Sequence, residues 1–409
     1  MKIYLVGGAI RDNLLNFPVK ERDWLVIGST PENMIKNGYK RVGKYFPVFL
    51  NPKTHEEYAL ARMEYKINLG HKGFAFFSSP NVTLKEDLYR RDLTINAIAQ
   101  DINGKIIDPY NGKKDIKLKI LRHISNSFKE DPLRVLRVAR LAAKFFHLKF
   151  KIAKETFNLM KLMSKELNYL SAERIWKETE KALNTNNPHI YFKILYECYA
   201  LKILFPEFYS LFKIQEINYN NKKINSGMHT ILSIKIASKL SKDIVIRFSA
   251  LCHDFGKILF LNKKFIEYHD YVSEGIKLLE LFCKRLKIPN FLKKAAKIVI
   301  KYHIIINNIF CLSSKEILKL LYSIDVWRHK KILKQVIISS ESDIKSFLQY
   351  NKKCYYQGIY LTNIYNIVKK INASSIIKEG ICGYEISKKL FILRNNAIKK
   401  LCKNKKFYF

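Results

Sequence analysis

The chain has 409 residues, 48% of them hydrophobic, so it is long enough for two to four domains and can bury sizeable cores. This composition excludes global disorder. Lysine and arginine number 74 against 35 acidic residues, a formal net charge of +39. Such an excess favours a polyanionic partner, because phosphate neutralisation supplies most non-specific affinity for nucleic acids. Abundant Lys, Ile, Asn, Tyr and Phe are also typical of an AT-rich genome, so the charge alone does not establish that partner.

The seven cysteines are scattered without a Cys-x-x-Cys pair, which argues against both a disulfide framework and a zinc ribbon. We therefore expect reduced thiols in a cytoplasmic protein. Residues 3–6 form too short an apolar run for a signal peptide. The apolar run at residues 298–310 is broken by Lys301 and His303 and falls short of the roughly 20 residues of a membrane helix. We expect no membrane association.

The predicted secondary structure changes near residue 130. Before it, short β-rich runs alternate with turn sequences, which predicts strands at residues 2–6, 24–27, 48–51, 58–62 and 106–108. Beyond it, apolar residues recur at spacings of three and four, which predicts helices at residues 133–146, 154–163, 172–182 and 190–199. Loops are expected at residues 184–188 and 218–227, the second of which precedes a further helical domain.

The most informative stretch is residues 5–23. A strand-like run ends in Gly7-Gly8, a helix-like segment carrying Arg11 follows, and Glu21 and Asp23 lead into the next apolar run. Positions two apart on a strand share a face, so both carboxylates would point the same way. Mg²⁺ takes one or two carboxylates and completes its shell with phosphate oxygens and water.

Glycines let backbone N–H groups approach phosphates, and an arginine adds positive charge. A Gly-Gly pair alone is an ordinary turn, and an acidic pair alone is a solvated strand edge. Their order predicts a Mg²⁺-nucleotide site, with Gly8 and Arg11 on the nucleotide.

A second signal is Asp131-Pro132 followed by arginines at 134, 137 and 140. Asp is a good helix cap and Pro a good first helical residue. The three arginines fan across roughly 120° of a helix, close enough to converge on one ligand, although a solvated basic face is the alternative. A carboxylate accepts from an exocyclic amino group and an arginine donates to a ring nitrogen or carbonyl oxygen. Asp131 with Arg134 can therefore pair with cytosine or adenine and reject uracil and guanine.

A third signal is Arg90-Arg91-Asp92, with Asn96 four residues after the acid. Two arginines, an acid and an amide suit the phosphates and the sugar hydroxyl of a nucleotide. A surface turn and a helix cap are the alternatives.

These motifs together resemble the nucleotidyltransferase superfamily that includes DNA polymerase beta. Within it, they resemble the tRNA CCA-adding enzymes and bacterial poly(A) polymerases. Further matching motifs, at residues 55–62, 108–112 and 173–178, extend the resemblance over essentially the whole chain. It is similar to the enterobacterial type of CCA-adding enzyme with a C-terminal HD domain. The Gly-Gly turn within eight residues of Met1 and the HD segment favour that type over poly(A) polymerases.

The resemblance implies residue roles. Glu21 and Asp23 would be the catalytic Mg²⁺ ligands, although the family pattern is Asp-x-Asp and Glu21 adds a methylene, from which we expect weaker or shifted activity. Asp131 and Arg134 would select the base. With Gly8, the nucleotide-binding residues are expected to be Arg11, Arg91, Arg137 and Arg140. The resemblance also makes Asp92 and Asn96 candidates for nucleotide contact.

His229 and the sequence Cys252-His253-Asp254-Phe255-Gly256-Lys257 resemble an HD phosphohydrolase core. His229, His253 and Asp254 are plausible ligands for a transition metal such as Ni²⁺. Two positions depart from the family, because Tyr271 occupies a histidine slot and Ile304 follows His303 where relatives carry Asp. The segment is therefore either an active phosphohydrolase or a degenerate fold kept as a tRNA-binding scaffold.

The sequence thus predicts an α/β nucleotidyltransferase head with a polymerase-beta-like mixed sheet, an all-α body and an α-helical HD domain. The expected boundaries are 1–128 for the head, 129–222 for the body, 223–330 for the HD-like domain and 331–409 for a C-terminal helical region. The expected function is untemplated addition of CCA to the tRNA acceptor arm from CTP and ATP, by a monomer or homodimer. A poly(A) polymerase, a chiefly HD-type phosphohydrolase and a non-catalytic tRNA-binding remnant are the alternatives.

Overall fold

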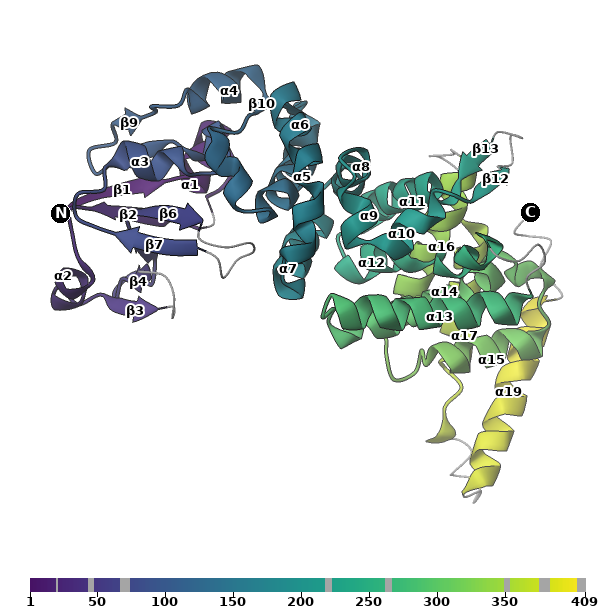
Figure 1. The fold of residues 1–409 in the computed structure, drawn as a ribbon. Helices are drawn as coiled ribbons and strands as arrows, with labels where there is room; N and C mark the ends of the chain where they lie inside the picture. The colour runs from purple at the N-terminus through teal and green to yellow at the C-terminus, as the bar shows by residue number, and fades with distance from the viewer. Residues whose placement is uncertain are drawn as a thin grey trace. The chain divides into compact units, whose positions relative to one another are not determined.

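The structure is a computed structural model, and it describes residues 1–19, 21–42, 48–66, 74–217, 223–261, 267–348, 354–374 and 383–402. The chain forms two compact units, Met1–Leu204 and Phe205–Phe409. Figure 1 shows the mixed sheet of the first unit and the helices of the second. The predicted fold class of a mixed-sheet head followed by helices is confirmed. The finer division at residues 128, 222 and 330 stays a prediction, and residues 218–222 of the predicted loop lie outside the described residues.

A seven-stranded sheet forms the base of the first unit, in the order β3-β4-β5-β2-β1-β8-β9. Only β2 and β5 pair in parallel, and all other neighbours are antiparallel. The strands are β1 Lys2–Val6, β2 Asp23–Ile27, β3 Lys40–Val42, β4 Val48–Leu50, β5 Glu57–Leu60, β8 Ala99–Asp101 and β9 Ile106–Ile107. A separate antiparallel pair consists of β6 Arg62–Lys66 and β7 Phe74–Ser78. Each predicted strand is present, the fourth divided between β5 and β6.

Alternation along β2 places its residues in two different cores. Leu25 packs with Val6, Leu88 and Ala97 on one face of the sheet. Val26 belongs to a core on the other face, which α2 Pro31–Lys36 supplies with a buried methionine. Successive side chains of a strand point to opposite faces, so Asp23 shares the face of Leu25. Asp23 therefore lies at the end of the strand on the side where α3 Leu84–Tyr89 packs.

Helices complete the first unit. Near the sheet lie α1 Gly8–Leu14, the 3₁₀ helix η2 Thr94–Asn96 and α4 Gly112–Leu118. The four helices predicted after residue 130 are confirmed as α5 Leu133–Phe145, α6 Lys154–Leu162, α7 Ala172–Leu183 and α8 Pro188–Glu197, followed by α9 Ala200–Leu204. The predicted start of α5 is also confirmed, because the Leu133 amide donates to Asp131 Oδ1 at 3.0 Å. The helix α5 packs against α7 and α8.

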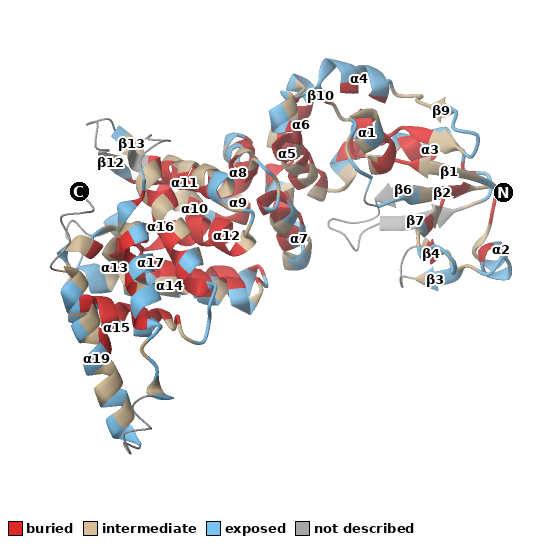
Figure 2. Ribbon diagram, turned by 180° about the vertical axis from the view of Figure 1, so that it is seen from behind, coloured by how far each residue is buried: buried red, intermediate tan, exposed pale blue. Residues whose placement is uncertain are grey.

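The second unit is a helical bundle, in which buried residues lie along the facing sides of its central helices (Figure 2). The helix α16 Ile332–Leu348 packs against α11 Ser226–Leu240, α12 Ile244–Cys252 and α14 Asn290–Asn307. The 3₁₀ helix η6 Phe255–Leu261 follows α12 and packs against α13 Tyr268–Arg285. The remaining elements are α10 Pro206–Leu211, β12 Gln215–Ile217, β13 Lys223–Asn225, α15 Ser314–Ile324, α17 Tyr356–Val368 and α19 Tyr384–Cys402.

Two expectations about the whole chain can be compared with the described residues. None of the helices described is long and apolar enough to span a bilayer. The six described cysteines are free thiols, and the seventh, Cys382, lies outside the described residues.

The contact between α4 and η2 gives a test of the packing that supports the nucleotide-binding motifs. A methyl group on Gly112 would lie 2.3 Å from the carbonyl oxygen of Thr94 and 2.8 Å from Ile98 Cγ1. We expect Gly112→Ala to lower the free energy of unfolding by about 1–3 kcal/mol, because the backbone must shift. The exposed neighbour Lys113 provides a control, whose change to alanine should cost less than about 0.5 kcal/mol in the same urea titration. Equal effects would contradict the packing argument.

Candidate functional site

One cavity of about 1090 Å³ in the first unit gathers the predicted head residues. It is lined by the ends of β1, β2 and β5, by the segment after α3, and by α1, α5 and α7. All nine residues predicted for catalysis, nucleotide binding and base selection line it: Gly8, Arg11, Glu21, Asp23, Arg91, Asp131, Arg134, Arg137 and Arg140. Residues that are separated by up to 132 positions in sequence thus meet in one place.

The glycine turn after β1 supports one wall of the cavity. Gly7 has a φ of 76°, a left-handed conformation that glycine adopts without steric cost. A methyl group on Gly7 would lie 2.9 Å from Arg91 Nη1, so the missing side chain leaves room for that guanidinium. The Gly7 amide donates to the Ile98 carbonyl at 3.1 Å, which fixes the turn to the chain just before β8.

Three carboxylates share this end of the sheet. The strand β2 begins at Asp23, so Glu21 precedes the strand instead of lying on it as the face argument assumed. Both residues nevertheless line the cavity, together with Glu57, which is the register partner of Asp23 across the parallel pair. The sequence motif at 55–62 contained Glu57, but nothing local distinguished it from Glu56.

Desolvation inside the cavity and the charge of Glu21 raise the pKa of Asp23, against the opposing effect of Arg91 and Arg137. Asp23 is exposed to solvent within the cavity. Its desolvation therefore comes from the protein atoms of the surrounding cavity walls. Adjacent carboxylates that repel one another are stabilised by a hard cation with oxygen preference. The donor set of Glu21 and Asp23 therefore fits Mg²⁺.

A chain of hydrogen bonds joins the glycine turn to α5 through the buried carboxylate of Asp92. Arg137 Nε donates to Asp92 Oδ2 at 2.7 Å, and Asn96 Nδ2 donates to Asp92 Oδ1 at 2.9 Å. Asn96 Oδ1 in turn accepts from Arg11 Nη1. Arg137 and the hydrogen bond from Asn96 outweigh burial and hold the pKa of Asp92 well below its usual range. Asp92 therefore remains ionised and positions Arg137, a role that the sequence did not indicate.

The other arginines of α5 are also fixed by acceptors. Arg134 Nη1 donates to the Ser127 carbonyl and Arg134 Nη2 to the Arg90 carbonyl, both at 2.6 Å. Arg140 Nε donates to Glu178 Oε2 on α7 at 2.5 Å. Charge-assisted bonds of this kind set the plane of a guanidinium group. The three arginines thus line the cavity and are bonded to protein acceptors, in place of the solvated basic face that was the alternative.

Asp131 is held from two sides at the start of α5. Its Oδ1 accepts from the Leu133 amide, and its Oδ2 accepts from Arg174 Nη2 at 2.7 Å. Arg174 lies on α7 within the matching motif at 173–178 and lines the same cavity. The structure brings Asp131 and Arg134 to one cavity wall, and base selection by this pair stays a prediction.

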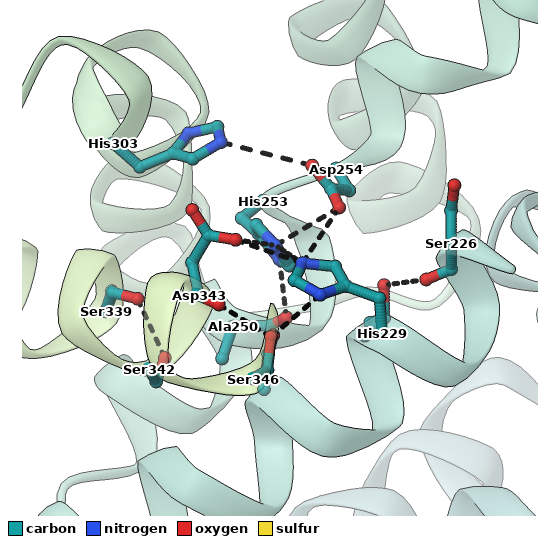
Figure 3. A network of polar contacts seen from close by, with 12 residues as sticks. Ser226, His229, Ala250, His253, Asp254, His303, Ser339, Ser342, Asp343 and Ser346 are labelled. Carbon is teal, nitrogen blue, oxygen red and sulfur yellow. Dashed lines mark hydrogen bonds and ion pairs between the residues drawn. The ribbon is translucent and has the colours of Figure 1, made fainter. Parts of the chain in front are cut away.

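A second polar cluster lies in the second unit, between α11, the end of α12 and α16 (Figure 3). Ligand atoms of His229, His253 and Asp343 all lie within 4.8 Å of one another. His229 Nε2 is 3.0 Å from Asp343 Oδ1 and 3.2 Å from His253 Nε2. Asp254 Oδ2 lies 3.4 Å from His229 Nε2 and 3.3 Å from His253 Nε2. The three predicted HD residues therefore meet, and they are joined by Asp343.

The outer ring nitrogens fix which inner nitrogen atoms can act as ligands. His253 Nδ1 donates to the Ala250 carbonyl at 2.9 Å. The Ser346 hydroxyl gives its proton to the Asp343 carbonyl, so His229 Nδ1 donates to Ser346 Oγ at 2.7 Å. When these rings are neutral, their Nε2 lone pairs lie on the side of the two carboxylates. Imidazole nitrogens and carboxylates suit a divalent transition metal, so the donor set fits such an ion.

The two sequence departures also find places in this cluster. Tyr271 stands at the position where the family carries a histidine. Its hydroxyl lies within hydrogen-bond distance of the His253 carbonyl (3.0 Å) and of Asp254 Oδ1 (3.2 Å), and so connects α13 to the segment after α12. His303 Nε2 approaches Asp254 Oδ1 at 4.0 Å. Burial lowers the pKa of His253, but the charges of Asp254 and Asp343 outweigh it and raise that pKa to about 10. The cluster therefore attracts positive charge.

Comparison with known proteins bears on the fold that carries these sites. Residues 3–122 match the family model described as "Poly A polymerase head domain", and residues 149–211 match "Probable RNA and SrmB- binding site of polymerase A". A CCA-adding enzyme of Thermotoga maritima complexed with tRNA has 18% identity and a TM-score of 0.63, over 98% of this chain and 87% of that chain. The Bacillus stearothermophilus enzyme in complex with CTP has 20% identity and a TM-score of 0.58, over 97% of this chain and 89% of that chain.

The chain has the fold of the CCA-adding enzymes. A structure of such an enzyme with ATP, at 20% identity and a TM-score of 0.62, covers 97% of this chain and 86% of that chain. The CCA-adding fold accounts for the helices of both units as well as the head, since nearly the full length is matched.

Several residues of this CCA-adding fold were missed by the sequence arguments. Glu57, Arg174 and Lys181 line the head cavity, and Asp343 completes the second cluster. Arg174 lay in a motif that had been noticed without a role. Asp343 lies beyond residue 330, where we expected the HD-like domain to end, and no local pattern marks it.

The ion pair between Asp92 and Arg137 predicts how the stability of the folded chain depends on pH. We expect Asp92→Asn to lower the free energy of unfolding at pH 7 by about 1–3 kcal/mol, because the carboxylate no longer pairs with Arg137. The pKa of Asp92 is lowered in the folded chain, so its stabilising effect is present above the ordinary carboxyl pKa of about 4 and declines as pH falls below it. Urea titrations of both proteins at pH 7 and pH 3 should therefore show a smaller difference in stability at pH 3. A difference that is the same at both values would refute the charge argument.

Proposed function

We propose that the chain is a nucleotidyltransferase that adds C, C and A to tRNA 3′ ends without a nucleic-acid template, using CTP and ATP and releasing pyrophosphate. The observation that supports it is the convergence of the predicted catalytic, nucleotide-binding and base-selecting residues on one cavity. The enterobacterial HD-containing type remains part of the proposal.

Glu21 and Asp23, with Glu57 beside them, would hold Mg²⁺. When bound, Mg²⁺ lowers the pKa of the attacking 3′-hydroxyl and stabilises the charge on departing pyrophosphate. The chain's own contribution is orientation. Arg137 and Arg140, each held at Nε by a carboxylate, would present fixed guanidinium planes to the triphosphate or ribose. Gly8 and Arg11, at the glycine turn and on α1, and Arg91, after α3, would also contact the nucleotide.

Base selection would depend on Asp131 and Arg134. The carboxylate accepts from the exocyclic amino group that cytosine and adenine share, and the guanidinium donates to a ring nitrogen or carbonyl oxygen. Since Asp131 is held by Arg174 and the Leu133 amide, its position does not depend on the substrate. The basic helices after residue 130 would hold the tRNA acceptor arm by its shape and phosphates.

A transition-metal ion such as Ni²⁺ at His229, His253 and Asp254 is also part of the proposal. Its support is the imidazole and carboxylate donor set. These three residues are 0–1% exposed, and phosphoester hydrolysis is not part of the proposed function.

The deciding experiment supplies a tRNA transcript that lacks CCA. We expect two C residues to be added with CTP alone and one A residue after ATP is supplied. A poly(A) polymerase would ignore CTP and add many A residues, and a tRNA-binding remnant would add nothing at any Mg²⁺ concentration. Asp23→Ala should reduce incorporation at least about 100-fold while the variant still binds tRNA in a filter assay. Retained incorporation would place the metal ligands elsewhere.

The departure at Glu21 gives a second test of activity. Mg²⁺ demands near-ideal geometry, and the additional methylene of Glu displaces the ligand oxygen. We therefore expect Glu21→Asp to raise kcat by roughly 3-fold or more. Glu56→Asp is the matched control, because Glu56 bonds to Trp24 Nε1 and does not line the cavity. If Glu21→Asp is no faster than the parent chain, the methylene is not what limits this site.

A further inference from the structure

The buried carboxylate of Asp87 holds the two arginines that follow α3. Asp87 is 0% exposed and lies on that helix, so Arg90 and Arg91, three and four residues later, meet it one helical turn further on. Arg90 donates to Asp87 Oδ1 from Nη2 at 2.6 Å and from Nε at 3.1 Å. Arg91 Nη2 donates to Asp87 Oδ2 at 3.2 Å. The two carboxylate oxygens are thus divided between two guanidinium groups.

The orientation of Arg91 depends on this contact. Arg91 lines the head cavity, and a methyl group on Gly7 would lie 2.9 Å from its Nη1, so its guanidinium lies against the glycine turn. Its Nε is buried and has no hydrogen-bond partner among the described residues. The charge-assisted bond to Asp87 therefore sets the plane of this guanidinium and leaves Nη1 on the side of the turn.

Arg90 connects the same carboxylate to Arg134, the residue predicted to select the base. The backbone carbonyl of Arg90 accepts from Arg134 Nη2 at 2.6 Å. A second set of bonds joins the same segments, since the Ser127 hydroxyl donates to the Tyr89 carbonyl at 3.3 Å and the Ser127 carbonyl accepts from Arg134 Nη1. Asp87 holds the side chain of Arg90, so the loss of that bond would release an acceptor that orients Arg134.

Both contacts require the charge of Asp87. Burial raises the pKa of Asp87, but the positive charges of Arg90 and Arg91 outweigh burial and lower that pKa below its ordinary value, so the carboxylate stays ionised. An asparagine would keep the shape and replace one acceptor oxygen by an NH₂ group, which would face a guanidinium donor. Asp87 is not among the described residues that line the cavity, whereas Arg90 and Arg91 are. It therefore acts through its arginine partners and not by touching a substrate.

We propose that Asp87 is a positioning residue that sets nucleotide affinity and base choice together. It orients Arg91 toward the triphosphate and, through Arg90, holds an acceptor that orients Arg134 toward the base. The inference rests on the proposed function, in which Arg91 contacts the nucleotide and Arg134 selects its base. One buried carboxylate then links recognition of the phosphates, which every nucleoside triphosphate carries, to recognition of the base, which distinguishes CTP and ATP from UTP and GTP.

The first experiment measures nucleotide binding by the full chain, by calorimetric titration with CTP and with UTP in the presence of Mg²⁺ and without tRNA. We expect Asp87→Asn to weaken CTP binding by roughly 10-fold, because Arg91 loses the bond that orients it. The ratio of CTP affinity to UTP affinity should fall by about 3-fold or more, because Arg134 loses a fixed acceptor. Glu86→Gln is the matched control on the same helix, since Glu86 caps α3 through Thr83 and does not line the cavity. It should change both values by less than about 2-fold.

A double variant separates positioning from a general loss of structure. In an Arg91→Ala background, Asp87→Asn should weaken CTP binding by less than about 3-fold, because no guanidinium remains there for Asp87 to direct at the phosphates. The ratio of CTP to UTP affinity should still fall, since the route through Arg90 is intact. In CCA addition to a tRNA transcript that lacks CCA, Asp87→Asn should raise the KM for CTP and lower kcat by less than about 3-fold, because Arg91 would hold the triphosphate equally in the ground and transition states.

Two results would overturn the inference. An equal loss of CTP affinity with and without Arg91 would mean that Asp87 only stabilises the fold, and an unchanged ratio of CTP to UTP affinity would mean that it does not act on base choice. If Asp87→Asn does not fold, Arg90→Gln decides the second point, because it removes the side chain through which Asp87 reaches Arg134 and should lower the same ratio. A parent chain that binds CTP and adds no nucleotide would count against the proposed function, while the binding comparison would still decide the role of Asp87.

Discussion

The buried carboxylate of Asp92 is the constraint on which the nucleotide cavity depends. The cavity collects many cationic side chains, which repel one another unless each is compensated. Asp92 compensates Arg137 directly and reaches Arg11 through Asn96, so the glycine turn, η2 and α5 are joined by one set of hydrogen bonds. The same carboxylate that permits these charges to lie close together also orients them. Charge compensation and fixed geometry thus have one physical origin.

The second cluster has an excess of carboxylates over cations, the opposite of the head cavity. Its histidines and carboxylates gather around one point, whereas the head cavity is organised around excess positive charge. In both places the outer atoms of the key side chains are held by neighbouring protein groups. The His229 ring is oriented by its bond to Ser346, and the Arg140 guanidinium is oriented by its bond to Glu178. Buried polar groups specify one arrangement only when their partners are all in place.

The features that the sequence predicted correctly depend on the spacing of residues close together in the chain. The strand–glycine turn and the arginine spacing on α5 depend on backbone periodicity, and they predicted the elements and nine cavity residues. Long-range pairing could not be predicted in the same way. Asp343 joins His229 across 114 positions, and neither its helix nor its neighbours carry a ligand-like spacing. Glu21 marks another limit, because the face argument assumed a strand that begins only at Asp23.

The two sites differ in how far their carboxylates are exposed to solvent. Nucleotide addition requires substrates to enter and pyrophosphate to leave, and the head provides a cavity of about 1090 Å³ with Glu21 and Asp23 exposed at its edge. The second cluster shows the reverse, since His229, His253 and Asp254 are 0–1% exposed and lie in surroundings of low dielectric constant. Solvent therefore reaches the carboxylates of the head cavity far more readily than those of the cluster between α11, α12 and α16.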